Sequence, residues 1–202
     1  MRIAIVGAVA LLAAGCLGSL KEPVAQPFMY RIDAPRLRPA GALPIDLKVD
    51  VSHAAPGLEG SGIATRLPGQ RLEYVAGARW AEVLPQLLEA ALVEGLQDSG
   101  RLRSVQSDYG RFRATHTLVV DVRRFEMDYT AGVLPVAQVS LAVTLGRTGD
   151  RRILAAYTVS ASEPAAENRQ TAAVAALNAA FARAVAEMAD KAFDALAAET
   201  QE

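Results

Sequence analysis

The chain contains little cysteine or histidine and no excess of either charge, and each shortage excludes a class of protein. One cysteine among 202 residues has no partner for an internal disulfide. One cysteine with two histidines cannot supply the four ligands of a zinc finger or zinc ribbon. The 21 basic residues are balanced by 22 acidic ones, so there is no basic excess to displace counterions from nucleic acid. We therefore expect no nucleic-acid partner and no metal centre.

Hydrophobic residues are abundant, at 51% of the chain, and they are unevenly distributed. This proportion is far above that of a disordered chain, and 202 residues are enough for one domain around a single core. After Met1 and Arg2, residues 3–14 contain no charge. This stretch is too short to span a bilayer, which takes about 20 residues in a helix. It matches the hydrophobic region of a secretory signal peptide.

The only cysteine follows this stretch directly. Residues 12–16 (LAAGC) resemble the lipobox of bacterial lipoproteins, although Ala13 stands where that family prefers leucine. The resemblance implies that the signal peptide 1–15 is cleaved, that the Cys16 thiol is diacylated and that the new amine receives an acyl chain such as palmitate. Leu17 stands where aspartate commonly retains lipoproteins at the inner membrane, which implies the periplasmic face of the outer membrane. The alternatives are an ordinary signal peptide with an incidental cysteine, or a buried N-terminal helix.

The remaining chain is expected to consist of a lipidated tether at 16–27 and one domain at 28–202. Alternating apolar residues predict strands, and two segments follow the 3.6-residue period of a helix. The clearest strands are at 47–51, 116–129, 139–145 and 153–161, and the helices are at 79–98 and 167–198. Pro85 is best accommodated if the first helix starts near Ala81, and otherwise it introduces a kink. This order predicts an α+β fold, with a mostly antiparallel sheet of about five to seven strands and two helices packed on one face.

The apolar pattern of the strand at 116–129 changes face partway along. Up to residue 122 the apolar side chains occupy even-numbered positions, whereas beyond Arg123 and Arg124 they are Phe125, Met127 and Tyr129. An extra residue is needed to keep a single face buried, so we predict a β-bulge near Arg123 and Arg124. The alternative is a regular strand that buries one face in the core and offers the other to a partner.

No residue pattern typical of an active site is present. His53 and His116 lack a metal-binding spacing, and His116 shares a face with apolar residues, which favours a core or interface histidine. The glycine-rich loop at 54–62 lacks the spacing of a phosphate-binding loop. We expect no catalytic residue, no metal ligand and no cofactor other than the covalent lipid on Cys16. A tethered hydrolase stays open because catalytic triads assemble in space rather than in sequence.

Short segments spread along the mature chain resemble one family. Tyr30–Asp33 forms a strand after the cysteine, Ala78–Glu82 opens a helix after an aromatic strand, and Leu96–Gly100 closes that helix. This order is similar to the ABC-type transport auxiliary lipoproteins, the PqiC/YmbA group, over nearly the whole mature chain. The resemblance implies a non-catalytic accessory of an MCE-type lipid transport system, with MCE-domain and ABC transporter proteins as partners and assembly with itself.

The same resemblance marks Tyr74, Arg79 and Trp80 as candidate partner or family-motif residues. Of these, Trp80 is expected to be a core residue rather than a partner contact. A second hypothesis from a different class is a structural lipoprotein that supports envelope assembly and has no transport role.

Removing the proposed acylation site tests the anchor. We expect Cys16→Ala to release the protein from the outer membrane or to mislocalise it, because no acyl chain can then form the anchor. Membrane fractionation and incorporation of labelled palmitate measure this effect. A Cys16→Ala protein that still fractionates with the outer membrane would contradict it.

Overall fold

A computed structural model describes residues 26–39 and 41–201. The expected signal peptide 1–15, Cys16 and most of the tether 16–27 lie outside these described residues. Along the chain, the elements are β1 (Phe28–Tyr30), β2 (Leu43–Ala54), β3 (Gly62–Leu67), β4 (Arg71–Trp80), α1 (Leu84–Asp98), β5 (Leu102–Ser107), β6 (His116–Asp128), β7 (Val136–Arg147), β8 (Ile153–Pro164) and α2 (Gln170–Thr200).

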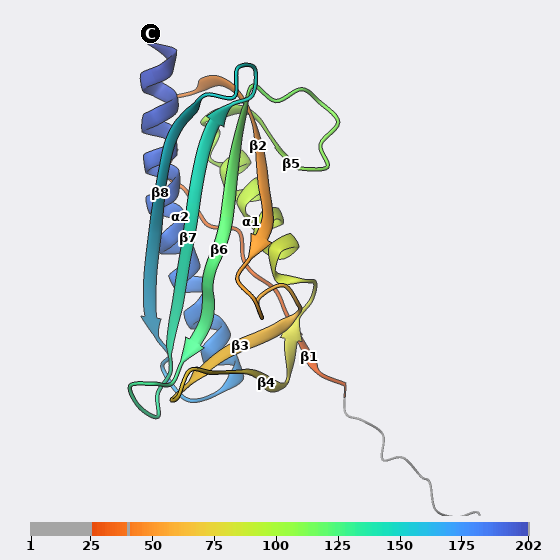
Figure 1. Cartoon of the computed structure of the whole chain (residues 1–202), viewed down its shortest axis with the longest axis vertical. Coiled ribbons are helices and arrows are strands. Elements are labelled where there is room, and N and C mark those ends of the chain that lie inside the picture. Colours follow the sequence, from red (N-terminus) through yellow and green to blue (C-terminus); the bar gives the residue numbers. More distant parts are fainter. Residues whose placement is uncertain (1–25, 40, 202) are drawn as a thin grey trace, which may run out of the picture.

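All eight strands belong to one sheet, and the long strand β6 connects its parts (Figure 1). On one side, β6 pairs antiparallel with β7, which pairs antiparallel with β8. On its other side, β6 pairs parallel with two strands in succession, first with β2 and then with β3. The sheet continues from β2 to β5, and from β3 through β4 to β1.

The predicted α+β class is confirmed, but the sheet is larger and more mixed than expected. It has eight strands, one more than the upper end of the prediction. The β6–β7–β8 meander and the β3–β4 hairpin are antiparallel, as expected. The parallel pairs join β1 with β4, β2 with β5 and β6, and β3 with β6. Their partners are distant in the sequence, so local periodicity carries no information about their direction.

Strand β6 contains the predicted β-bulge. Its register against β7 shifts between Val122 and Arg124, and its buried residues change from even-numbered positions to Phe125 and Met127. The extra residue therefore keeps one face of β6 buried along the whole strand. The shift falls between the part of β6 that pairs with β2 and the part that pairs with β3. The alternative of a regular strand with apolar residues on both faces is wrong.

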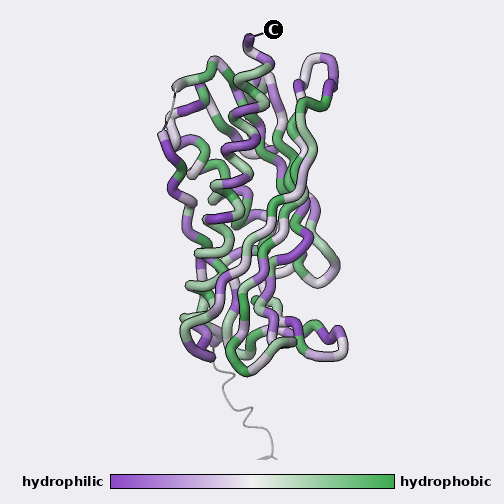
Figure 2. The backbone as a smooth tube through the Cα atoms, turned by 90° about the vertical axis from the view of Figure 1, so that its left-hand side faces the viewer, coloured by the Kyte–Doolittle hydropathy of each residue, from purple (hydrophilic) through white to green (hydrophobic). Residues whose placement is uncertain are grey.

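Both helices cover the same face of the sheet and leave the other face open (Figures 1 and 2). α1 packs on β2 and β5, whereas α2 packs on β6, β7 and β8. α1 begins at Leu84, with Pro85 in the first turn, where a helix does not need that amide hydrogen. The predicted helix start at residue 79 is wrong, because residues 79 and 80 complete strand β4. Ser99 and Gly100 follow the end of α1, as predicted.

The long helix α2 is a core element. By length and composition alone it could cross a membrane, but 56% of its most apolar stretch is buried inside the domain. The ring of Phe181 on α2 packs edge-on against Phe125, with 6.0 Å between the ring centroids. Phe125 in turn packs edge-on against Trp80, with 5.8 Å between centroids. These contacts connect α2 to β6 and β4. The stripe predicted for α2 is buried at Val174, Leu177, Phe181, Val185, Met188, Ala192 and Leu196.

Truncating Phe181, at one end of this aromatic row, tests the contribution of the row to stability. Phe181 has no exposed surface, so we expect Phe181→Ala to lower the free energy of unfolding by about 3–5 kcal/mol through the cavity it leaves. Phe112→Ala is the control, because Phe112 is 86% exposed and should change stability by less than about 0.5 kcal/mol. Urea unfolding followed by circular dichroism measures both. Equal losses for the two variants would show that the row is not a stabilising core.

Candidate partner-binding surface

The three residues marked by the family resemblance all lie on β4, but they do not face one surface. Gly77 has a φ of 67°, and the pairing of β4 with β3 is irregular between the Ala64–Tyr74 and Gly62–Arg79 partners. Successive residues of β4 therefore do not keep a simple alternation. As a result Tyr74 is 52% exposed while Trp80 is buried.

Trp80 is a core residue. Its ring packs against Phe125, and its backbone amide donates a hydrogen bond of 2.7 Å to the carbonyl of Ser61. Its indole nitrogen is buried without a hydrogen-bond partner among the described residues. Trp80 thus holds the end of the glycine loop against the core, and its side chain is not accessible to a partner protein.

Tyr74 covers the glycine loop from outside. Its hydroxyl donates a hydrogen bond of 2.9 Å to the carbonyl of Gly57, and its ring lies where a Cβ atom on Gly62 would be. Leu72 occupies the corresponding space at Gly57, which has a φ of 88°. The loop therefore requires glycine because side chains of β4 lie against its backbone.

Arg79 lies next to this aromatic cover. Gly62, which lies under the ring of Tyr74, is also the strand partner of Arg79. The guanidinium lies 3.9 Å from the sulfur of Met29 on β1, and within 26–39 and 41–201 no carboxylate forms an ion pair with it. We call the exposed side chains of Met29, Leu72, Tyr74 and Arg79 the β4 patch.

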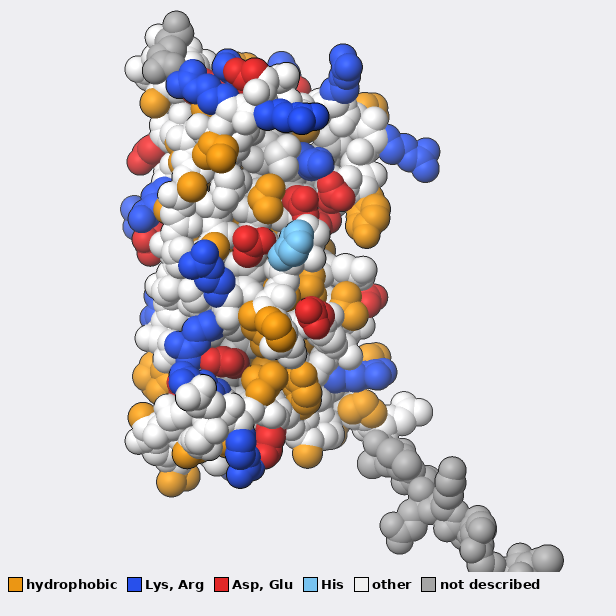
Figure 3. Space-filling view, viewed as in Figure 1, with side chains coloured by type: hydrophobic (Ala, Val, Ile, Leu, Met, Phe, Trp, Pro, Cys, Tyr) orange, Lys and Arg blue, Asp and Glu red, His pale blue; other side chains and the backbone are white. Residues whose placement is uncertain are grey.

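The β4 patch has the composition of a binding surface. Figure 3 shows hydrophobic side chains gathered over β3 and β4, on the face of the sheet that the helices leave open. Met29 is 59% exposed and Leu72 is 40% exposed. Tyrosine and arginine beside exposed apolar side chains are typical of the residues that contribute most to protein interfaces. The β4 patch therefore has the composition of a surface that is suited to contact with another protein.

The two histidines do not lie in this patch, and His53 does not form a triad. Its Nδ1 atom is 3.1 Å from Oγ of Ser52 and 3.9 Å from Oδ1 of Asp121. Both contacts are made by the same ring nitrogen, whereas a Ser-His-Asp triad uses the two nitrogens for different partners. The side chain of His53 is also 78% exposed to solvent, so it does not lie in a site that excludes water.

His116 is buried and connects β6 to the end of α2, in agreement with the core histidine expected from the sequence. Its Nε2 atom is 2.6 Å from Oε2 of Glu199, and its Nδ1 atom is 2.9 Å from Oγ1 of Thr115. This order resembles a hydroxyl–imidazole–carboxylate relay. The Thr115 hydroxyl, however, also bonds the amide and the carbonyl of Asp46, at 3.1 Å each. It is held in the β2–β6 junction and is not placed as a nucleophile.

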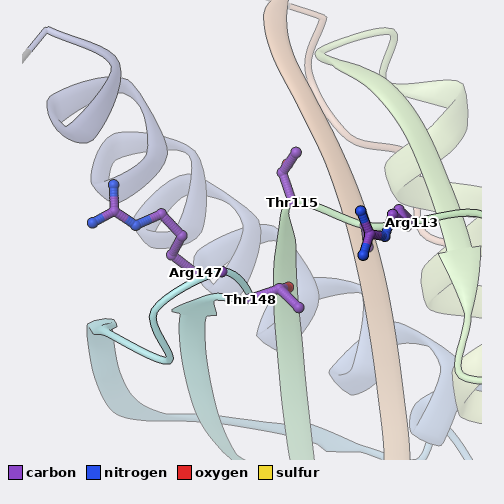
Figure 4. Close-up of a pocket in the computed structure, with 6 residues that line it drawn as sticks. Arg113, Thr115, Arg147 and Thr148 are labelled. Carbon is purple, nitrogen blue, oxygen red and sulfur yellow. The ribbon is translucent and has the colours of Figure 1, made fainter.

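An open hollow of about 630 Å³ lies beside this bridge and is lined by Arg113, Ala114, Thr115, Arg147, Thr148 and Gly149. In Figure 4, Arg147 extends toward α2 and Arg113 lies on the side of β2, so the two guanidinium groups do not converge. Arg147 instead pairs with Asp150 and Glu199, and its hydrogen bonds lower the pKa of Asp150 to about 2. The hollow therefore has no convergent cations for an anionic substrate.

In the part of the chain that the structure describes, no group of three or more His, Cys, Asp or Glu side chains is placed to bind a metal ion. The described residues form an α+β domain that exposes a patch of apolar, tyrosine and arginine side chains on β4 and β1.

The chain belongs to the ABC-type transport auxiliary lipoprotein family. The sequence profile described as "ABC-type transport auxiliary lipoprotein component" matches residues 32–189. Membership makes the protein a membrane-anchored lipoprotein and an auxiliary component of an ABC-type transport system. No curated protein matches the sequence.

Solved structures show the same fold. The chain is similar to protein XCC0632 from Xanthomonas campestris, with 26% identity, a TM-score of 0.79, and coverage of 87% of this chain and 99% of that one. It is also similar to the hypothetical protein CT253 from Chlamydia trachomatis, with 10% identity, a TM-score of 0.53, and coverage of 77% and 99%. At this identity the second likeness concerns the fold alone.

A pair of variants tests whether Tyr74 is the reason for the glycine at position 62. We expect Gly62→Ala to destabilise the domain by about 1–3 kcal/mol, because the new Cβ overlaps the tyrosine ring. In a Tyr74→Ala background most of this loss should disappear, since the two sites share one contact. Gly60→Ala is the control, because a Cβ at Gly60 meets nothing within 4 Å. Additive losses in the double variant, measured by urea unfolding, would contradict the contact.

Proposed function

We propose that this protein is an outer-membrane lipoprotein that faces the periplasm and serves an MCE-type lipid transport system as an accessory subunit, acting by binding and not by catalysis. The observation that carries the proposal is the match of the auxiliary-lipoprotein family to residues 32–189. The MCE system and the outer membrane follow from the resemblance of the mature chain to the PqiC/YmbA group and from Leu17 after the proposed anchor.

The proposed anchor is the acylated Cys16. It is the only cysteine of the chain, so acylation has no other thiol to use. Each buried CH₂ group contributes about 0.8 kcal/mol of membrane affinity, and two or three chains hold a protein effectively permanently. The charges of the domain are balanced, so it has no electrostatic attraction to anionic lipids. The lipid anchor therefore supports a function at a membrane.

The β4 patch supports binding as the mode of action. Arg79 has no carboxylate partner among the described residues, and the apolar side chains around it are exposed. An MCE-domain or ABC transporter protein that presents a carboxylate within an apolar surface would satisfy both features. Desolvation by the surrounding apolar contacts would strengthen that ion pair.

A crosslinking pull-down tests both the system and the patch. We expect tagged full-length protein, crosslinked in intact cells, to capture an MCE-domain or ABC transporter protein identified by mass spectrometry. The double variant Tyr74→Ala, Arg79→Glu should lower that yield by about tenfold or more, since two central interface residues contribute well over 1.4 kcal/mol together. Arg113→Glu is the matched control, with the same change of charge at an exposed arginine outside the patch.

The outcomes separate the hypotheses. Capture of envelope-assembly proteins without any MCE or ABC protein would support the structural lipoprotein instead. Equal loss of capture with Arg113→Glu would show that net charge, and not the β4 patch, governs the contact. Capture that is unchanged in the double variant would keep the transport role and remove the patch from it.

A further inference from the structure

Three exposed apolar side chains outside the β4 patch lie at one end of the domain. Phe28 on β1 is 69% exposed, and Val133 and Leu134 in the loop between β6 and β7 are 78% and 55% exposed. We call these three residues the apolar base. These side chains do not contribute to the stability of the domain, because an exposed apolar side chain gains no free energy of burial. Exposed apolar residues at one end of a domain are typical of an interaction site.

Contacts place both parts of the base beside residues 165–171, which lead into α2. The carbonyl of Pro135, next to Leu134, accepts a hydrogen bond of 2.9 Å from the amide of Ala165 just before α2. Phe28 lines an open hollow with residues 168–171 at the helix start. Asn168 belongs to that hollow and also accepts a hydrogen bond of 2.9 Å from Tyr129, where the β6–β7 loop begins.

The loop that carries Val133 and Leu134 is free of charge. No Asp, Glu, Lys or Arg occurs between Asp128 and Arg147, a stretch that contains the whole loop and most of β7. The nearby charges of Glu167 and Arg169 pair with each other at 3.2 Å. The base is therefore suited to the acyl region of a bilayer and has no excess of basic groups for anionic headgroups.

The described chain begins at this same end. Gln26 and Pro27 lead directly into β1, and Figure 1 shows the chain entering at the end opposite to the C-terminus of α2. Only nine residues lie between Cys16 and Gln26, and the ten steps from one Cα atom to the other reach about 35 Å when fully extended. The 31 residues of α2 span about 46 Å.

These lengths distinguish the two ends of the domain. The other half of the molecule also exposes aromatic side chains, Tyr109 and Phe112 in the β5–β6 loop, at 82% and 86%. The tether is shorter than the length of α2. If Cys16 is held in a membrane, the domain therefore cannot invert and place its far end on the same membrane. The apolar base, in contrast, reaches the membrane without any extension of the tether.

We propose that the apolar base inserts into the leaflet that holds the lipid anchor and sets the domain upright on it, which rests on the proposed acylation of Cys16. The open face of the sheet, with the β4 patch, then stands along the membrane normal, and the β5–β6 loop points away from the membrane. The apolar base contacts the acyl region of the lipid. Membrane docking therefore does not require anionic headgroups, and added salt does not weaken it.

Tryptophan quenching by brominated lipids tests the proposal. The native chain has one tryptophan, Trp80, which is buried and gives a constant background. The full-length acylated protein is placed in vesicles of phosphatidylcholine with and without bromine on the upper acyl carbons. We expect Leu134→Trp and Phe28→Trp to be quenched several-fold more than Phe112→Trp, and this difference should persist in high salt.

Equal quenching of Leu134→Trp and Phe112→Trp would overturn the proposal, as would no quenching of either. If bromine has no effect but the emission of Leu134→Trp shifts to the blue with protein concentration, the base binds a second copy and the proposal fails. Mass spectrometry of the lipid on Cys16 distinguishes the two hypotheses. An acylated protein without quenching contradicts insertion alone, whereas an unacylated protein contradicts the proposed anchor.

Discussion

The bulge in β6 is the constraint on which the rest of the architecture depends. β6 pairs with β7 over its whole length, but its other edge is shared by β2 and β3, which arrive one after the other. A regular strand would turn the apolar residues beyond Arg124 to the open face. One inserted residue returns Phe125 and Met127 to the buried face, and so lets a single core extend under both parts of the sheet.

The family segment around Trp80 depends on that same placement. Phe125, just past the bulge, touches Trp80 on one side and Phe181 on the other, so the end of β4 and the middle of α2 meet through one ring. Trp80 is thereby committed to the core. Tyr74 and Arg79 lie on the same strand, next to Gly62, and their side chains are exposed. The segment therefore has a buried, structural residue and two exposed residues that are candidates for binding.

The two ends of the domain differ in chemistry. At the start of α2 the chain enters beside exposed apolar side chains and an uncharged loop. At the other end, His116, Glu199, Arg147 and Asp150 form a polar network that holds the last turn of α2 against β6 and β7. The proposed insertion of the apolar base gives the domain one direction on the membrane, and direction matters to a subunit that presents a binding surface to a transporter.

The features that arise from neighbouring residues could be predicted from the sequence. The signal stretch before Cys16, the alternation in the strands, the period of both helices and the change of face near Arg123 are local patterns, and those that fall within the described residues agree with the structure. The sequence pattern misplaced the start of α1, because the apolar period of the helix continues back into Trp80 although Pro85 favours a later start. Only the folded chain shows the parallel pairing of β2 and β3 with β6, the different exposure of Tyr74 and Trp80, and the position of Phe28 and Leu134 at the same end of the domain. Those depend on contacts between residues far apart along the chain, which no local pattern records.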